Sequence, residues 1–393
     1  MKLWIYIVRR LILLVPVIIG VMTITFLITA SLPIEERLTA VFGTGRVPLQ
    51  PYVSCSLLGL PGNGLCRNTV YFHDLHVLGL DQPAYVQWAI YIENSLTLNW
   101  GTTDAHSHAS EALLGSSTIP ITTALSWYVP YSLELATVSL FLILVIAVPL
   151  GNYSAVYRNR PLDQGARVMS FSGFALPGFL LATILLLAAT ALISSIPIGC
   201  GGTFFPFLQL YNSWPPFSCV GGQPSWIGMN YQTSPTGFPT VDALIHGQYW
   251  LAGDTLVRLI LPAFTIAYGS VAFILRYVRN SMLEVMNLDF VRTARSKGVP
   301  ERIVVRKHAG RNSLNVTITI LGLTFAGFIG GFPIIEDVFN LKGIGLVLVD
   351  SIQPTPDFGL IFGTTLLFTI IVVFANIIVD VLYAFLDPRV RLG

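Results

Sequence analysis

The chain has 393 residues, of which 53% are hydrophobic and only 11% charged, and its formal net charge is +2. An ordinary soluble globular protein carries about 25% charged residues, and the mean hydropathy of this chain is +0.70. The composition therefore excludes that class and predicts an all-α, multi-pass membrane protein.

Six apolar runs are long enough to cross a bilayer as helices, which takes about 20 residues. The first run is too long for a signal-peptide core and no small-residue cleavage pattern follows it, so we expect a retained N-terminal transmembrane helix within 1–32. The fourth is shorter, but the arginines that follow it can snorkel to the interface. The six runs are 11–32, 135–157, a run beginning at 168, 259–275, 312–335 and 358–379.

The basic residues fall mainly on one side of these predicted spans. With the N-terminus inside, 17 of the 22 lysines and arginines lie on the cytoplasmic side. The exceptions are Arg37, Arg46, Arg67, Arg258 and Lys342. Because positive loops stay in the cytoplasm, the sequence predicts a cell-membrane protein whose N- and C-termini are both cytoplasmic.

Two long segments then lie outside. Residues 33–128 are too long for a structureless loop, and the stretch QPAYVQWAIYIENSL at 82–96 is helix-like, so we expect an enlarged external domain between the first two helices. Residues 129–393 form the predicted core of five helices, with an external loop at 197–253.

All four cysteines fall in these external segments, where thiols form disulfides. Three pairings are possible; the local one joins Cys55 to Cys66 and Cys200 to Cys219. The pairs His73–His76 and His106–His108 have spacings that a metal could use, but no cysteine or carboxylate cluster accompanies them, so we predict no metal site. Glu134 and Asp380 stand at the edges of predicted spans, which weakens their case as membrane carboxylates with a function.

Basic residues crowd into the cytoplasmic segment 285–311. Asn287 or Asp289 can cap a short helix, Gly298 suits the left-handed position after it, and Pro300 and Glu301 suit the start of the next helix. The run K-G-V-P-E therefore predicts a helix–turn–helix elbow. Its cations are Arg292, Arg295, Lys297, Arg302, Arg306, Lys307 and Arg311.

A basic patch that binds anionic membrane lipid would account for this charge but not for the ordered elbow or its small residues. The stretch resembles the coupling segment of ABC-importer permeases, EAA followed four residues later by Gly, with Arg292, Thr293, Ala294 and Gly298 at those places. RRLILLVPVIIGVMTITF, LGLDQPAYVQWAIYI, SLELATVSLFLILVIAVPLG and IIVDVLYAFLDPRVR are similar to the B-type permeases of the dipeptide/oligopeptide branch. Lys342, Gly359 and Gly310 depart from the pattern of that branch.

The resemblance implies the type I permease fold, paired as a heterodimer with a second permease. It also implies two cytoplasmic ATPases, which bind ATP and Mg, and an external binding protein that delivers a peptide or an oligosaccharide. The external aromatic residues and the scarcity of charge favour a neutral sugar slightly. By the same resemblance, the residues that would couple this chain to the ATPases are Asp289, Arg292, Thr293, Ala294, Arg295, Lys297, Gly298, Pro300, Glu301 and Arg302.

The chain itself has no GxxxxGK[ST] motif and no nucleophile, base or metal cluster at membrane depth, so we expect neither an enzyme nor a bound cofactor, and no nucleic-acid partner. The alternative is a secondary transporter with a lipid-binding basic loop, which predicts internal repeats and charged residues at the membrane midplane; neither is evident.

Pro149, Pro177, Pro262 and Pro333 should bend or cap helices, and Gly327 and Gly331 have the spacing of close helix packing. The predicted pathway residues are Thr324, Gly327, Phe328, Gly331 and Phe332.

Overall fold

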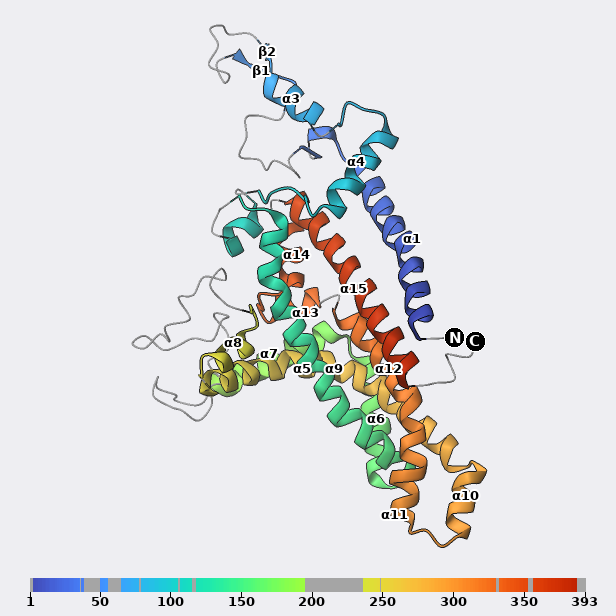
Figure 1. Ribbon diagram of the computed structural model, residues 1–393. Coiled ribbons are helices and arrows are strands. Elements are labelled where there is room, and N and C mark those ends of the chain that lie inside the picture. The colour runs from blue at the N-terminus through green and yellow to red at the C-terminus, as the bar shows by residue number, and fades with distance from the viewer. Residues whose placement is uncertain are drawn as a thin grey trace. The chain divides into compact units, whose positions relative to one another are not determined.

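The computed structural model describes residues 3–35, 37–38, 50–55, 65–77, 79–104, 107–114, 118–194, 236–247, 249–329, 332–352 and 356–386. Helices account for most of them, as the composition predicted (Figure 1). The chain divides into two compact units. The first unit comprises Met1–Val8, Pro130–Leu341 and Phe374–Gly393, and the second comprises Arg9–Val129 and Lys342–Val373.

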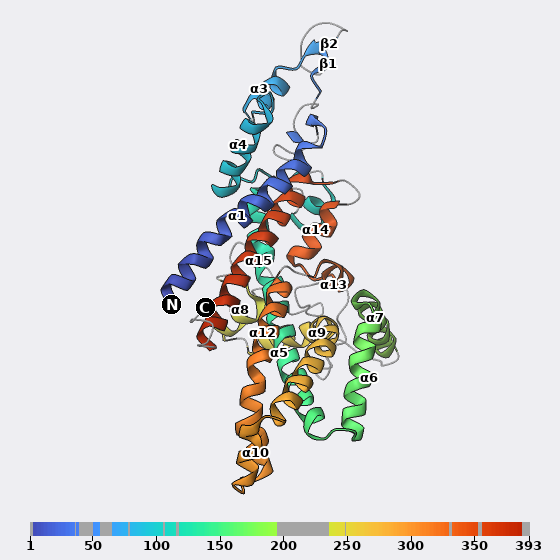
Figure 2. The ribbon, with the colours of Figure 1, turned by 90° about the vertical axis from the view of Figure 1, so that its right-hand side faces the viewer.

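In the first unit, the long helix α9 (Tyr249–Met286) packs against five other helices. It shares a core with the part of α5 (Ile121–Val156) that follows Pro130, where Leu135, Ile143, Ile274 and Val278 are buried. Its side-by-side arrangement with α12 is visible in both views (Figures 1 and 2). The five are α6 (Pro161–Ala175), α7 (Gly178–Ser194), α8 (Pro239–Ile245), α12 (Gly310–Ile329) and α13 (Pro333–Val338).

The second unit holds most of α1 (Leu3–Ala30) and of α15 (Phe358–Leu386). Its core joins Ile121, Leu125 and Tyr128 from the start of α5 to α14 (Ile344–Ile352) and to Leu360 of α15. The helix predicted at 82–96 is confirmed as α4 (Ala84–Leu96). The remaining elements are α3 (Thr69–Val77), the π-helical turn η2 (Ser110–Leu114) and the antiparallel strands β1 (Tyr52–Ser54) and β2 (Leu65–Arg67).

Three described helices are long and apolar enough to cross a membrane: Ile121–Val156, Leu259–Met286 and Phe358–Ile377. The helix pair Pro161–Ala175 and Gly178–Ala189 passes the same test together and gives a fourth span if it is counted as one. α1 contains the shorter apolar helix Val15–Ala30. A multi-pass membrane protein is therefore supported, whereas six spans and cytoplasmic termini stay predictions.

The run predicted to begin at 168 is not one straight helix. α6 and α7 meet at an angle of 106°, and the break falls at Leu176, which is extended (φ −94°, ψ 116°). Leu176 precedes Pro177, and a residue before proline is pushed out of helical geometry. The run predicted at 312–335 is also interrupted, because α12 ends at Ile329 and Pro333 opens the separate helix α13.

Candidate functional site

The basic segment forms the predicted helix–turn–helix elbow at the end of α9. α10 (Asp289–Ser296) is followed by Gly298 with φ 74°, and α11 (Glu301–Ile303) continues through the π-helical turn η5 (Val304–Ala309) into α12. The N–H of Val299 donates to the carbonyl of Ala294, 3.3 Å away, which closes the turn. The positive φ explains the glycine, because a residue with a Cβ is strained there.

The helix caps differ from the prediction by one position each. Leu288, not Asn287 or Asp289, is the N-cap of α10, and no side chain caps it. The Asn287 side chain instead donates to the carbonyl of Leu283. Asp289 occupies the first turn, where a carboxylate still complements the positive helix end. Pro300 is the N-cap of α11 rather than its first residue.

One face of the elbow is buried and the other is free. Val291 and Ala294 are buried in a cluster with Met282 of α9 and Ala155 of α5. The side chain of Arg292 is 69% exposed, with a loose 3.6 Å ion pair to Asp289. Thr293, Lys297, Gly298 and Arg302 are exposed as well. The elbow is thus fixed to the unit by its apolar side and presents cations on the other.

An ion pair holds the two arms of the elbow together. The guanidinium of Arg295 donates from Nη2 to Oε1 of Glu301 at 2.7 Å and from Nε to Oε2 at 3.1 Å. This pairing lowers the pKa of Glu301 and raises the pKa of Arg295. Because the two side chains are 40% and 56% exposed, the pair contributes no more than about 1 kcal/mol. Its role is to fix the angle of the elbow.

A cavity of about 760 Å³ lies beside the elbow. Tyr153 from the last turn of α5 and Tyr157 just after it line the cavity, together with Met282 and the arginines Arg302 and Arg306. The basic surface is therefore hollowed, which suits the docking of a second macromolecule better than a flat patch would.

A buried carboxylate next to this region was not foreseen. Asp163, at the start of α6, is fully buried, and its oxygens accept hydrogen bonds from Ser154 Oγ at 2.6 Å and the Asn159 backbone N–H at 2.9 Å. They also accept from Arg167 at 2.8 Å and from Arg279 at 2.9 Å. Arg167 stands four residues after Asp163, a spacing that signals a helical ion pair; nothing local indicates Arg279, on α9.

Of the predicted pathway residues, Thr324, Gly327 and Phe328 lie in the last turns of α12, and Phe332 is the N-cap of α13. Phe328 is buried and meets Phe332 edge to face, with ring centroids 4.9 Å apart. Thr324 donates to the carbonyl of Ile320 in its own helix. A Cβ at Gly327 would meet no described atom within 4 Å, so close helix packing at this glycine is wrong within the part of the chain that the structure describes. Gly331 lies outside the described residues.

A buried polar contact ties α8 to α5. The Thr240 hydroxyl donates to Oε1 of Glu134, and Oε2 of Glu134 is buried without a partner in the described chain. Ser132, two residues earlier, donates to Glu336 of α13 at 2.9 Å. Glu134 is therefore buried within the protein, its place at the edge of a membrane span stays a prediction, and no local pattern indicated Thr240 as its partner. The side chain of Asp380 is outside the described part.

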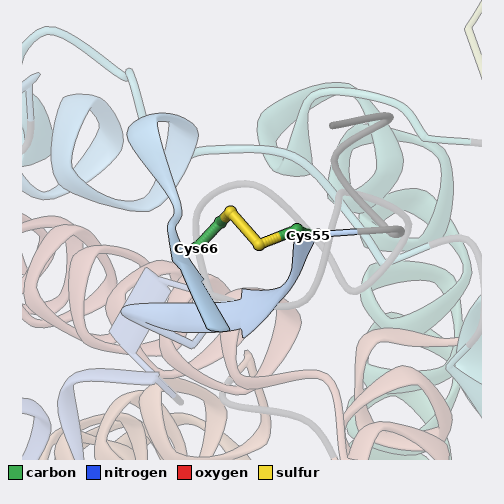
Figure 3. The surroundings of a disulfide bond; sticks show 2 residues. All are labelled: Cys55 and Cys66. Carbon is green, nitrogen blue, oxygen red and sulfur yellow. A yellow bond between two sulfur atoms is a disulfide. The ribbon is translucent and has the colours of Figure 1, made fainter. Parts of the chain in front are cut away.

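The disulfide between Cys55 and Cys66 is confirmed, with an S–S distance of 2.03 Å (Figure 3). It closes the β1–β2 hairpin, in which Val53 pairs with Cys66. Cys200 and Cys219 lie outside the described residues. In the described chain His73 contacts Asp74 and His76 contacts Asp81 at 2.8 Å, and no group of three metal-ligand side chains occurs there.

Comparison with known proteins shows the family to which this chain belongs. Residues 147–392 match the family described as binding-protein-dependent transport system inner membrane component. The chain is 34% identical over 317 residues, 80% of its length and 83% of the relative's, to the probable D,D-dipeptide transport system permease protein of Escherichia coli (strain K12). It is 30% identical over 386 residues, 98% of its length and 99% of the relative's, to the oligopeptide transport system permease protein of Bacillus subtilis (strain 168). Identity to the di/tripeptide transport system permease protein of Pseudomonas aeruginosa (strain UCBPP-PA14) is 29% over 391 residues, 98% of each chain.

Proposed function

Because the chain belongs to the family of inner membrane components of binding-protein-dependent transport systems, we propose that it is the permease subunit of an ABC importer for short peptides. The names of the relatives, which specify dipeptides, di/tripeptides and oligopeptides, support a peptide as the substrate. They outweigh the slight preference for a neutral sugar that the external aromatic residues gave.

The elbow is the part of the chain through which we propose that the ATPases act on the membrane helices. Its apolar face is fixed to α9 and its cationic face is free, so a force applied to α10 from the cytoplasm would move α9 and α12 with it. We propose that two ATPase subunits seat on the elbows of this chain and of a second, related permease. ATP and Mg would be held by those ATPases, and an external binding protein would deliver the substrate.

The remaining assignments follow from this role. Residues 33–128 would form an external domain, 129–393 the core with the external loop 197–253, and 285–311 the coupling segment, in a six-span cell-membrane protein with both termini in the cytoplasm. Thr324, Gly327, Phe328, Gly331 and Phe332 would face the pathway.

Arg292→Glu tests the coupling proposal. Its side chain is exposed and outside the Arg295–Glu301 pair, so the elbow should fold while the sign of its free face changes. We expect the ATPases to drop out of the purified assembly while the second permease stays. Arg158→Glu, an exposed cation on the loop between α5 and α6, is the matched control and should keep all partners.

Uptake into proteoliposomes tests the substrate, with ATP on the ATPase side and a labelled dipeptide or oligosaccharide on the other. ATP-dependent uptake of the peptide alone is expected. If the chain instead purifies alone, ignores Arg292→Glu and transports in response to an ion gradient, the alternative of a secondary transporter with a lipid-binding basic loop replaces the proposal.

A further inference from the structure

The second unit contains a small cavity at the end of α1 and the beginning of α15. Its volume is about 170 Å³, and most of its wall is apolar. The last turns of α1, the middle of α4, the Asn99–Gly101 segment and the first turns of α15 form this wall. Phe26, Ile90, Trp100, Phe362 and Leu366 are its large apolar side chains.

A partly buried cation lines this cavity. Arg37 is half-buried, and Nη2 donates to Oε1 of Gln87 at 2.7 Å. Among the described residues no carboxylate lies within ion-pair distance of Arg37. Burial lowers the pKa of Arg37, because the guanidinium has lost part of its contact with water. Groups whose pKa is shifted in this way cluster at functional sites.

Tyr91 of α4 also lines the cavity, and its hydroxyl is buried beside the hydroxyls of Ser95 and Thr25. The amides of Asn94 and Asn99 line the same cavity. The site therefore combines one cation, several neutral donors and an apolar wall, which is the usual make-up of a small-ligand pocket.

We propose that this cavity binds the free C-terminal carboxylate of a short peptide, with Arg37 pairing with the carboxylate and an apolar last side chain lying against Trp100 and Phe362. The inference rests on the proposed peptide transport and on the proposed orientation, in which this end of α1 and α15 faces the outside. The volume accommodates about one residue, and a neutral oligosaccharide would leave Arg37 without an anion.

Equilibrium dialysis tests the site directly. The assembled importer, without its binding protein, is embedded in nanodiscs and dialysed against radiolabelled N-acetyl-alanyl-leucine or its C-terminal amide. We expect the free acid to bind at least about tenfold more tightly than the amide, because a charge-assisted hydrogen bond is lost in the amide. Arg37→Gln should remove this preference.

Arg67→Gln is the matched control, since Arg67 is a cation of the same unit that lies over the ring of Phe72, away from the cavity. It should leave the preference unchanged. Arg37→Gln should change the melting temperature little, because losing the hydrogen bond to Gln87 is offset by removing a partly desolvated charge. A large fall in melting temperature in Arg37→Gln would assign Arg37 a structural role and overturn the proposal.

Other outcomes overturn it too. These are equal binding of acid and amide, no binding of either, or a lipid that co-purifies with wild type and is lost from Arg37→Gln. Measuring peptide uptake distinguishes a failure of the proposed function from a failure of the cavity assignment. If wild-type importer moves no peptide, the proposed function fails. If it moves peptides and Arg37→Gln keeps the same preference for the acid, only the cavity assignment fails.

Discussion

Asp163 is a fully buried carboxylate of the first unit that accepts hydrogen bonds from several elements. These come from α5, from the loop before α6, from its own helix and from Arg279 of α9. Such a group stabilises the fold only while all of its partners remain, because each arginine left behind is a charge without an anion. Glu301, by contrast, is exposed, and its pair with Arg295 orients the elbow rather than stabilising the fold.

Replacing Asp163 by alanine should therefore be strongly destabilising. The side chain of Arg279 is only 16% exposed, so we expect the free energy of unfolding to fall by roughly 3 kcal/mol. Chemical denaturation in detergent measures this. Glu284→Ala, which removes an exposed carboxylate of α9, should change it by no more than about 0.5 kcal/mol. Equal effects of the two substitutions would show that the Asp163 network contributes nothing.

At the level of the elements, α6 and α9 approach closely where a glycine allows it. A Cβ at Gly173 would lie 2.4 Å from the Cβ of Ala272 and 3.3 Å from the carbonyl of Tyr268. The Ser172 hydroxyl is 2.5 Å from that of Tyr268 in the same contact. The glycine thus sets the distance between the two helices just before the break at Pro177.

Gly173→Ala should push these helices apart and lower stability by about 1–3 kcal/mol. Gly165→Ala is its control in the same helix, where an added Cβ meets nothing within 4 Å. There alanine should raise stability by roughly 0.5–1 kcal/mol, because glycine weakens a helix interior. Thermal unfolding of the two variants measures both stability changes. If both substitutions change stability in the same direction, the close-contact interpretation is refuted.

At the level of the whole molecule, the proposed orientation places the elbow and the disulfide hairpin on opposite sides of the membrane. Ser296 on α10 and Val77 on α3 are both exposed. With Cys200 and Cys219 changed to serine, a cysteine at position 296 should react with an impermeant maleimide only in inside-out vesicles. A cysteine at position 77 should react only in right-side-out vesicles. Labelling of both from one side would reject the topology.

Much of this architecture follows from local sequence. Apolar runs specified helices, and K-G-V-P-E specified the elbow, because a positive φ at Gly298 and the fixed φ of Pro300 act within a few residues.

Where the structure differs from these predictions, the differences are also local. The N-caps of α10 and α11 lie one position from where they were predicted. Helices end shortly before Pro177 and Pro333, inside runs that apolar composition alone predicted as continuous. Apolar composition alone could not locate those ends, since it is the same on both sides of a bend. The prolines did indicate them, because Pro177 and Pro333 were among the four expected to bend or cap helices, whereas Pro149 and Pro262 lie inside α5 and α9.

What only the tertiary structure decided are the contacts between distant residues. Asp163 and Arg279 are 116 positions apart, and Thr240 and Glu134 are 106 apart. Arg37 lines a cavity whose wall includes Phe362. No periodicity or motif encodes such pairs, because they depend on how helices pack and not on backbone preferences. The sequence by itself determined the membrane class, the helices, the elbow and the family. Packing decided which of the described charges pair with one another and which side chains line each cavity.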